Sequence, residues 1–259
     1  MRKIVALLIS VLVLLPLFGG VAFAGGENEV RMIGHKGYSE MYPGNTALSF
    51  RMAGEAGFDG VETDVRMTKD GVLVTSHDSE IETADGKTMK ISRCTFDELT
   101  AQPLLNEESD DEVYLCSLSE YFDICKEYGM ECFVEIKEYL PIWKLFEMTK
   151  LAEEHYDIEK CEFETFELLV LLAAKLACPR INAMVTSNSF NFNVKLALLF
   201  GFDLDINYSG LSEEIVSKFH GRGAKVCTFT VNDENELKNA ASMGVDYIQT
   251  DCFSSADAS

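Results

Sequence analysis

The stretch that decides the fold is GVETDVRMTKDGVLVTSHD, residues 60–78, which opens as a buried strand and yet carries two carboxylates. Side chains alternate between the two faces of a strand, so Glu62 and Asp64 share one face while Val61 and Val65 share the other. Two negative charges on one face repel each other. The stretch therefore indicates a strand whose acids are stabilised by a positive group.

The N-terminal segment is typical of a secretory signal peptide that covers residues 1–24. Two basic residues precede an uncharged run that continues to Ala24 and ends in Ala-Phe-Ala. An uncleaved membrane anchor is the alternative, because the run is just long enough to span a bilayer. Pro16 and the Gly19-Gly20 pair interrupt a helix before its end and favour cleavage. We therefore expect a secreted, extracellular protein with no stable membrane span after cleavage.

The chain is strongly acidic, with a formal net charge of −21 over 259 residues. Removal of the signal peptide takes away two positive charges and no negative one, so −21 becomes −23. Such a surface repels phosphate backbones, which argues against nucleic acid as a partner. Strong attraction to anionic lipid headgroups is not expected either.

Eight cysteines in an exported chain would permit disulfides, but their spacing does not select a pairing. No C-x-x-C pair occurs, which argues against a zinc or thioredoxin-like site. Cys132, Cys161 and Cys227 lie in apolar stretches, where a free thiol packs as a small hydrophobe. Core packing is therefore favoured over a disulfide framework.

Short apolar runs alternate with helix-like stretches along the mature chain, residues 25–259. The predicted strands are residues 30–34, 60–65, 132–136, 161–163, 181–185, 204–207, 225–230 and 247–249. The predicted helices are residues 46–56, 117–128, 142–154, 165–177, 190–200, 212–221 and 233–243. Eight strands separated by helices predict an α/β fold, a (β/α)₈ barrel. A doubly wound open sheet is the alternative.

One interval, about residues 66–116, is too long for a simple connection between the second strand and the helix that follows it. It predicts an inserted subdomain with a short hairpin. The interval ends in an acidic run that includes Glu107, Glu108 and Asp110. Consecutive charges on a loop do not converge on one point, so this run predicts a solvated loop rather than a metal site.

Carboxylates collect at the carboxyl ends of the predicted barrel strands. In (β/α)₈ barrels this end of the strands holds the active site. Glu62 and Asp64 lie on the second strand, and Glu135 lies on the third, in VEIK. Three converging carboxylates are hard oxygen ligands that favour Mg²⁺ or Ca²⁺. The alternative is that Glu62 and Asp64 pair with a basic residue at a strand end, for which Lys137 is a candidate.

Two histidines fall close to this predicted metal site. His35 follows the first strand, and His77 lies downstream of the second. Histidines placed there could act as general acid and general base, although a lone histidine is more often a hydrogen-bonded surface residue. Lys137 could balance the charge of a phosphate. The other two histidines, His155 and His220, lie on helix-like stretches and are expected to be structural or solvated.

Three segments resemble the glycerophosphodiester phosphodiesterase family. They are GHKGYSEMYPGNTALSFRMAGEAGFDGVETDVRMTKDGVLVTSHD, VEIK and KVCTFTVNDENELKNAASMGVDYIQTD, which lie in order between about residues 31 and 251. The resemblance implies the (β/α)₈ fold with an insertion in the same place. It also implies cleavage of a small glycerophosphodiester to sn-glycerol 3-phosphate and an alcohol, with one divalent cation as cofactor.

The resemblance also implies roles for individual residues. His35 and His77 match the two catalytic histidines, and Lys137 matches a lysine that contacts phosphate. The divalent-metal ligands of the family match Glu62, Asp64 and Glu135. By resemblance, the glycerol 2-hydroxyl attacks the phosphorus while the histidines move protons.

Departures from the family pattern fall on the substrate side. Lys36 stands where the family usually has Arg, and Gly44 stands where it usually has Glu. Phe229 stands where Trp is usual, which keeps an aromatic wall without the indole donor. Lys36 and Phe229 are therefore expected to contact the substrate or its phosphate. Two alternatives remain open: a phospholipase D-like enzyme acting on lysophospholipids, and a non-catalytic protein that binds phosphate-bearing ligands.

Overall fold

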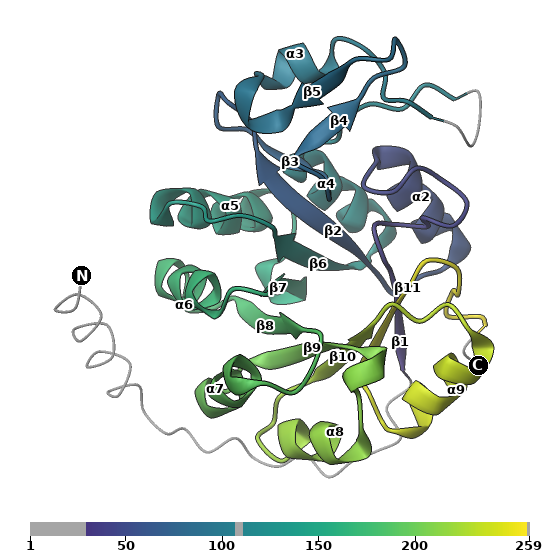
Figure 1. Ribbon diagram of the computed structural model, residues 1–259, viewed down its shortest axis with the longest axis vertical. Helices are drawn as coiled ribbons and strands as arrows, with labels where there is room; N and C mark the ends of the chain where they lie inside the picture. The colour runs from purple at the N-terminus through teal and green to yellow at the C-terminus, as the bar shows by residue number, and fades with distance from the viewer. Residues whose placement is uncertain (1–29, 107–110, 258–259) are drawn as a thin grey trace, which may run out of the picture.

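Eight parallel strands close into a barrel in the computed structural model, which describes residues 30–106 and 111–257 (Figure 1). The barrel strands are β1 (Arg31–Gly34), β2 (Gly60–Met67), β6 (Glu131–Ile136), β7 (Cys161–Thr165), β8 (Asn182–Ser187), β9 (Asp203–Asn207), β10 (Val226–Phe229) and β11 (Tyr247–Thr250). Each pairs in parallel with the next, and pairing of β1 with both β11 and β2 closes the ring. The predicted (β/α)₈ barrel is confirmed, and the open sheet is excluded. The expected signal peptide lies outside the described residues.

Seven longer helices surround the barrel (Figure 1). They are α2 (Ala47–Ala56), α4 (Leu118–Tyr128), α5 (Ile142–His155), α6 (Leu168–Ala177), α7 (Phe192–Phe200), α8 (Glu213–His220) and α9 (Glu234–Ser242). Two short 3₁₀ turns, η2 (Ile158–Lys160) and η3 (Tyr208–Gly210), complete the connections. Thr46 begins α2 with a capping box, and Gly57 ends it with a φ of 82°. None of the described helices has the length and apolar character needed to span a bilayer.

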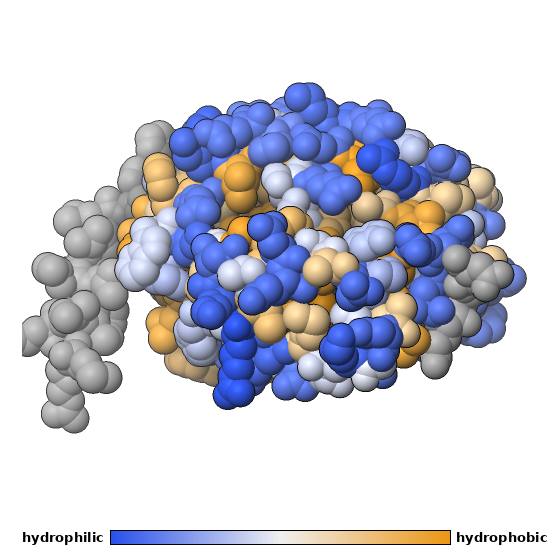
Figure 2. All heavy atoms as spheres, turned by 90° about the horizontal axis from the view of Figure 1, so that it is seen from above, coloured by the Kyte–Doolittle hydropathy of each residue, from blue (hydrophilic) through white to orange (hydrophobic). Residues whose placement is uncertain are grey.

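The insertion between β2 and α4 is a small layer beyond one edge of the barrel. It holds β3 (Leu73–Thr75), the antiparallel hairpin β4 (Glu80–Glu82) and β5 (Thr88–Lys90), the 3₁₀ turn η1 (Ile91–Arg93), and α3 (Phe96–Thr100). The predicted hairpin is therefore present. β2 runs two residues further than predicted, because β3 pairs with its end. The face over this layer is mostly hydrophilic, with small apolar patches (Figure 2).

The core has two parts on the two sides of the barrel wall. The larger part lies between the strands and the helices, and a second cluster fills the inside of the barrel with Ile33, Phe133, Met184, Cys227 and Tyr247. All eight cysteines fall within the described residues as free thiols, and six of them are buried. This agrees with the prediction of core packing.

Tyr121 on α4 ties the helix layer to the two strands that carry the predicted metal ligands. Its buried hydroxyl donates to the Val61 carbonyl at 2.8 Å and accepts from the Phe133 amide at 3.1 Å. Val61 precedes Glu62, and Phe133 lies two residues before Glu135. The contact therefore fixes β2 and β6 relative to each other.

Replacement of Tyr121 by Phe should lower the free energy of unfolding by about 1–3 kcal/mol, because it leaves buried backbone groups without a partner. Urea unfolding monitored by circular dichroism measures this loss. Tyr114→Phe is the matched control, since that hydroxyl bonds Glu112 at the surface. Equal stability of both variants would contradict the role given to Tyr121.

Candidate active site

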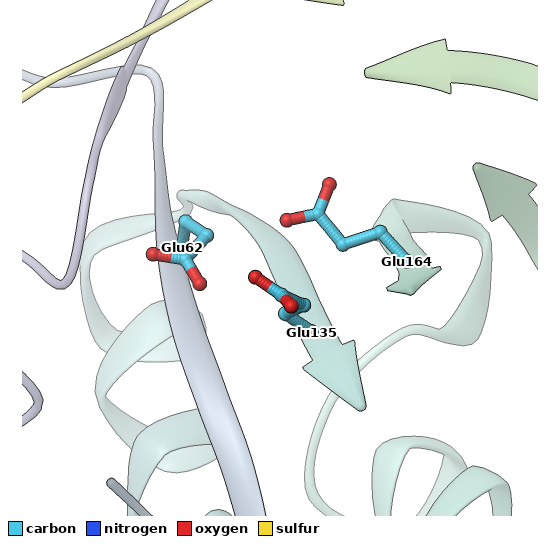
Figure 3. A group of neighbouring side chains, drawn as sticks. All are labelled: Glu62, Glu135 and Glu164. Atoms are coloured by element: carbon cyan, nitrogen blue, oxygen red, sulfur yellow. The ribbon is translucent and has the colours of Figure 1, made fainter. Parts of the chain in front are cut away.

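Three carboxylates meet inside the barrel mouth, one from each of the neighbouring strands β2, β6 and β7 (Figure 3). Glu62, Glu135 and Glu164 are buried, and each offers an oxygen within 4.8 Å of the others. The barrel brings them together because Glu135 pairs in register with Asp64 on one side and with Glu164 on the other. Paired residues on adjacent parallel strands point to the same side, which here is the interior.

The charges in this group are poorly compensated. One oxygen of Glu62, Oε2, accepts a hydrogen bond from the Lys36 amide at 2.9 Å, whereas Oε1 is buried without a partner. Burial, Asp64 and Glu135 raise the pKa of Glu62 well above its usual value. Burial and then Asp205 do the same to the pKa of Glu164. A bound cation removes this repulsion, so the residues present fit a divalent metal ion.

Asp64 has a different environment although it lies only two residues from Glu62. Its carboxylate accepts from Asn45 Nδ2 at 2.8 Å and pairs with Lys137 Nζ at 2.9 Å. Burial favours the neutral acid, but Lys137 and Asn45 outweigh it and lower the pKa of Asp64. Lys137 also reaches Glu135 Oε2 at 2.8 Å. The predicted acids Glu62, Asp64 and Glu135 therefore come together, and the alternative pairing with Lys137 is present at Asp64.

His35 is held at the end of β1 by a carboxylate from the other end of the chain. Its Nδ1 lies 2.8 Å from Asp251 Oδ1, directly after β11. Ser39 and Asn232 also donate to Asp251. Burial alone would raise the pKa of Asp251, but the hydrogen bonds from His35, Ser39 and Asn232 lower it to about 2. A stable carboxylate thus fixes the ring through Nδ1 and leaves Nε2 for chemistry.

A cavity of about 360 Å³ opens beside His35 and is lined in part by Lys36, Gly44 and Asn232. This volume suits a small polar molecule. The departures Lys36 and Gly44 are neighbours here, because a Cβ at Gly44 would lie 3.1 Å from Lys36 Cβ. A side chain at position 44 would therefore make a tight contact with Lys36, which a small shift of Lys36 would relieve.

His77 lies on the Glu135 side of the mouth and is half exposed. Its carbonyl accepts two hydrogen bonds from Arg66, and its Nδ1 lies 3.0 Å from Asp78 Oδ1. Burial raises the pKa of Glu135, while Lys137 and also His77 oppose that rise. The two predicted histidines thus belong to different strand ends of the same mouth.

Phe229, the predicted aromatic wall, ends β10. Its ring makes an edge-on contact with Phe166, which follows β7, at 6.2 Å between centroids. The contact closes the mouth on the side of Glu164 with apolar surface.

Two residues of this site were not identified from the sequence. Glu164 continues the strand of CEFET and repeats the two-residue spacing of Glu62 and Asp64, but the predicted strand stopped at residue 163. Asp251 closes the motif QTD directly after the last strand. Its contact with His35 joins residues 216 positions apart, which no local pattern reveals.

A closed (β/α)₈ barrel with an acidic mouth and histidines at its strand ends defines a class of hydrolytic enzymes. Comparison with known proteins makes this specific. Residues 35–254 match the glycerophosphoryl diester phosphodiesterase family, so the chain belongs to that family and its enzyme class is glycerophosphodiester phosphodiesterase.

Relatives and solved structures agree over most of the chain. A glycerophosphodiester phosphodiesterase of Bacillus altitudinis is 27% identical over 85% of this chain and 94% of its own. A phosphodiesterase of Oleispira antarctica, solved with the product sn-glycerol-3-phosphate, has a TM-score of 0.78 at 25% identity, covering 85% of this chain and 92% of that one. A glycerophosphodiester phosphodiesterase of Thermotoga maritima has a TM-score of 0.69 at 26% identity, over 86% and 94% of the two chains.

Divalent cations should raise the melting temperature of the protein, because binding to the folded state stabilises it. Glu62→Gln should abolish this rise and should stabilise the metal-free protein, since it removes a buried charge that has an unpartnered oxygen. Thermal unfolding with and without Mg²⁺ or Ca²⁺, after chelation, measures both effects.

Glu162→Gln is the matched control for this experiment. Glu162 is another buried glutamate with an unpartnered oxygen, and it lies outside the three-carboxylate group. Its variant should keep the full response to metal. A full response in Glu62→Gln as well would contradict a metal site at Glu62.

Proposed function

We propose that the protein is a metal-dependent phosphodiesterase that hydrolyses glycerophosphodiesters to sn-glycerol 3-phosphate and an alcohol by histidine acid–base catalysis. The observation that carries the proposal is the position of the buried Glu62, which has an unpartnered oxygen and is bonded to the amide next to His35. Glu62 is therefore hydrogen-bonded to the residue that directly follows the candidate catalytic His35. The Oleispira structure with sn-glycerol-3-phosphate supports the same product.

Glu62 and Glu135 are the residues that would hold a Mg²⁺ or Ca²⁺ ion, with Asp64 and Glu164 on either side of Glu135 to complete the oxygen ligands. A bound divalent ion polarises a phosphoryl oxygen and offsets the charge of the phosphate. The ammonium of Lys137 lies at the mouth beside Asp64 and Glu135. When substrate binds, it would turn from these carboxylates toward the phosphate. Lys36 extends along the cavity as a second positive charge.

The two histidines would move the protons of the reaction. The attacking hydroxyl, by family resemblance the glycerol 2-hydroxyl, gives its proton to one imidazole as it bonds to phosphorus. The bond from phosphorus to the alcohol oxygen breaks, and the other imidazole protonates the departing alkoxide, which leaves poorly as an anion. These bond changes leave a cyclic phosphate of glycerol. Water then attacks its phosphorus, the bond to the glycerol 2-oxygen breaks, and that oxygen regains a proton, which gives sn-glycerol 3-phosphate. Asp251 supports His35 in this role because it holds the ring through Nδ1 and leaves Nε2 toward the reacting groups.

Lysophospholipids are a second candidate substrate, favoured by exposed apolar residues at the mouth. Tyr139 and Trp143 follow β6, and Phe166 follows β7. Such residues could contact an acyl chain. Product analysis separates the two candidates, because a lysophospholipid would give lysophosphatidate or a cyclic phosphate in place of sn-glycerol 3-phosphate. A purely ligand-binding protein is disfavoured, since an anionic group has little use in capturing phosphate alone.

We also propose that the protein acts outside the cell after its signal peptide is cleaved. The pattern of residues 1–24 and the acidic composition support export. The expected partner is a small glycerophosphodiester.

Incubation with glycerophosphocholine and Mg²⁺ or Ca²⁺ should release sn-glycerol 3-phosphate, measured by a coupled dehydrogenase assay. His35→Ala and His77→Ala should each lower kcat by about 10²–10⁴-fold, the usual contribution of a positioned acid or base. His155→Ala is the control, because that histidine pairs with Asp123 at the end of α5. A near-full rate in either variant would remove that histidine from the mechanism.

Asp251→Asn should lower kcat by about 10- to 100-fold, a part of the acid–base contribution, and should change KM little, because Asp251 acts through His35. The thermal response to metal should stay unchanged, since Asp251 lies outside the carboxylate group. Asp246→Asn, which removes the partner of His220, is the matched control. A loss confined to KM would assign Asp251 to substrate binding instead.

A further inference from the structure

Within the predicted mature chain, residues 25–259, a long segment is free of acidic residues. The whole sequence carries 43 Asp and Glu residues, yet residues 168–202 contain none. This segment forms α6, β8 and α7, and its charged residues are Lys175, Arg180 and Lys195. The segment is therefore poor in charge, because Arg180 pairs with Glu153 of α5 and Lys175 donates to the Ile181 carbonyl.

Large apolar side chains are exposed along the same side. In α6, Leu169 and Leu176 are exposed, and their spacing of seven puts them on one face. In α7, Phe192 and Leu199 have the same spacing. The first turns of the adjoining helix α5 add Ile142, Trp143 and Phe146, and Phe200 at the end of α7 is also exposed. We call the exposed apolar residues of these three helices the α5–α7 wall: Ile142, Trp143, Phe146, Leu169, Leu176, Phe192, Leu199 and Phe200.

The three helices that carry these residues lie in succession along one side of the barrel (Figure 1). Hydrophobic residues also show along that side in the view from above (Figure 2). Soluble proteins rarely expose a continuous apolar area of this kind unless it contacts a partner or a membrane. A helix that is apolar on its outer face as well as its inner face gives the same indication.

We propose that the α5–α7 wall docks the protein on an electrically neutral lipid surface, such as a phosphatidylcholine bilayer. Residues 168–202 bring no acid to the point of contact and Glu147 on α5 is paired with Lys144, which limits repulsion by the phosphate groups of the lipid, while the acidic remainder disfavours anionic membranes. Tyr139 and Trp143 extend the wall at the barrel mouth, and Tyr and Trp are the residues that prefer the membrane–water interface. The inference rests on surface chemistry and is independent of the proposed reaction.

A second copy of the chain is a poorer occupant for the wall. A two-fold contact places the same patch opposite itself. Lys195 of one copy would then meet no carboxylate from residues 168–202 of the other, because that segment has none. A neutral lipid surface does not require a carboxylate opposite Lys195.

Docking by this wall would place the candidate active site beside the bilayer. Tyr139 and Trp143 directly follow β6, which carries Glu135, and Leu169 lies in the first turn after β7, which carries Glu164. Substrate released from or held in the outer leaflet would then reach the mouth over a short distance.

Vesicle binding of the chain that begins at residue 25 tests the proposal. That chain keeps every described strand and helix, all of which lie beyond residue 30. It should cosediment with phosphatidylcholine vesicles, and the fluorescence of Trp143, the sole tryptophan of the sequence, should shift to shorter wavelength. Absence of both signals would overturn the proposal.

The triple variant Leu169→Gln, Phe192→Gln, Leu199→Gln should bind vesicles at least about tenfold more weakly, because three large apolar contacts are lost. These side chains are 72%, 71% and 64% exposed, so the fold should tolerate the change, which near-ultraviolet circular dichroism checks. Leu105→Gln, at an exposed leucine of the insertion, is the matched control and should bind as the parent does. Equal loss in both variants, or no loss in the triple variant, would contradict docking by the wall. So would a dimer, detected by light scattering, that the triple variant abolishes while vesicle binding is absent.

Discussion

The constraint on which this structure depends is the confinement of negative charge inside a closed barrel. Glu62, Glu135 and Glu164 are buried at one end of the barrel, and Asp205 stands close enough to act on Glu164. Lys137 pairs with Glu135 and with the neighbouring Asp64, and within the described residues it forms no ion pair with Glu62 or Glu164. Buried carboxylates with so little compensation lower the stability of the fold, and a cation bound there, as we propose, would offset that cost. The cost in stability and the candidate function therefore have the same origin.

Closure of the barrel also determines where the imidazole lies. β1 pairs with β11, which brings His35 beside Asp251, and β1 pairs with β2, which brings the Lys36 amide to Glu62. The first strand thus connects the candidate catalytic His35 to the carboxylate group through its two neighbours. Such a link requires a closed ring, because in an open sheet β1 could not contact both the second strand and the last.

The sequence predicted the parts of this site that follow local periodicity. The eight strands were found because their apolar runs are bounded by helical patterns, and Glu62 and Glu135 were found because acids interrupt those runs. Glu164 was missed where the predicted strand ended two residues early, and Asp251 because its contact with His35 is created by closure of the ring. The sequence left open whether Asp64 is a metal ligand or pairs with Lys137. The ion pair depends on a side-chain distance, which the spacing of residues along the chain does not determine.

The departures at positions 36 and 44 acquire a clear meaning from the same geometry. Residue 36 contributes its amide to Glu62 and its side chain to the cavity. The amide is the same in Lys and Arg, so the change from the family pattern leaves the bond to Glu62 intact and alters the lining of the cavity. Lys36 has a φ of 60°, which directs its amide toward Glu62 and its side chain over Gly44. A Cβ at position 44 would make a tight contact with Lys36, at 3.1 Å from its Cβ, so Gly44 gives room to the flexible point charge that stands in place of the planar fork of an arginine.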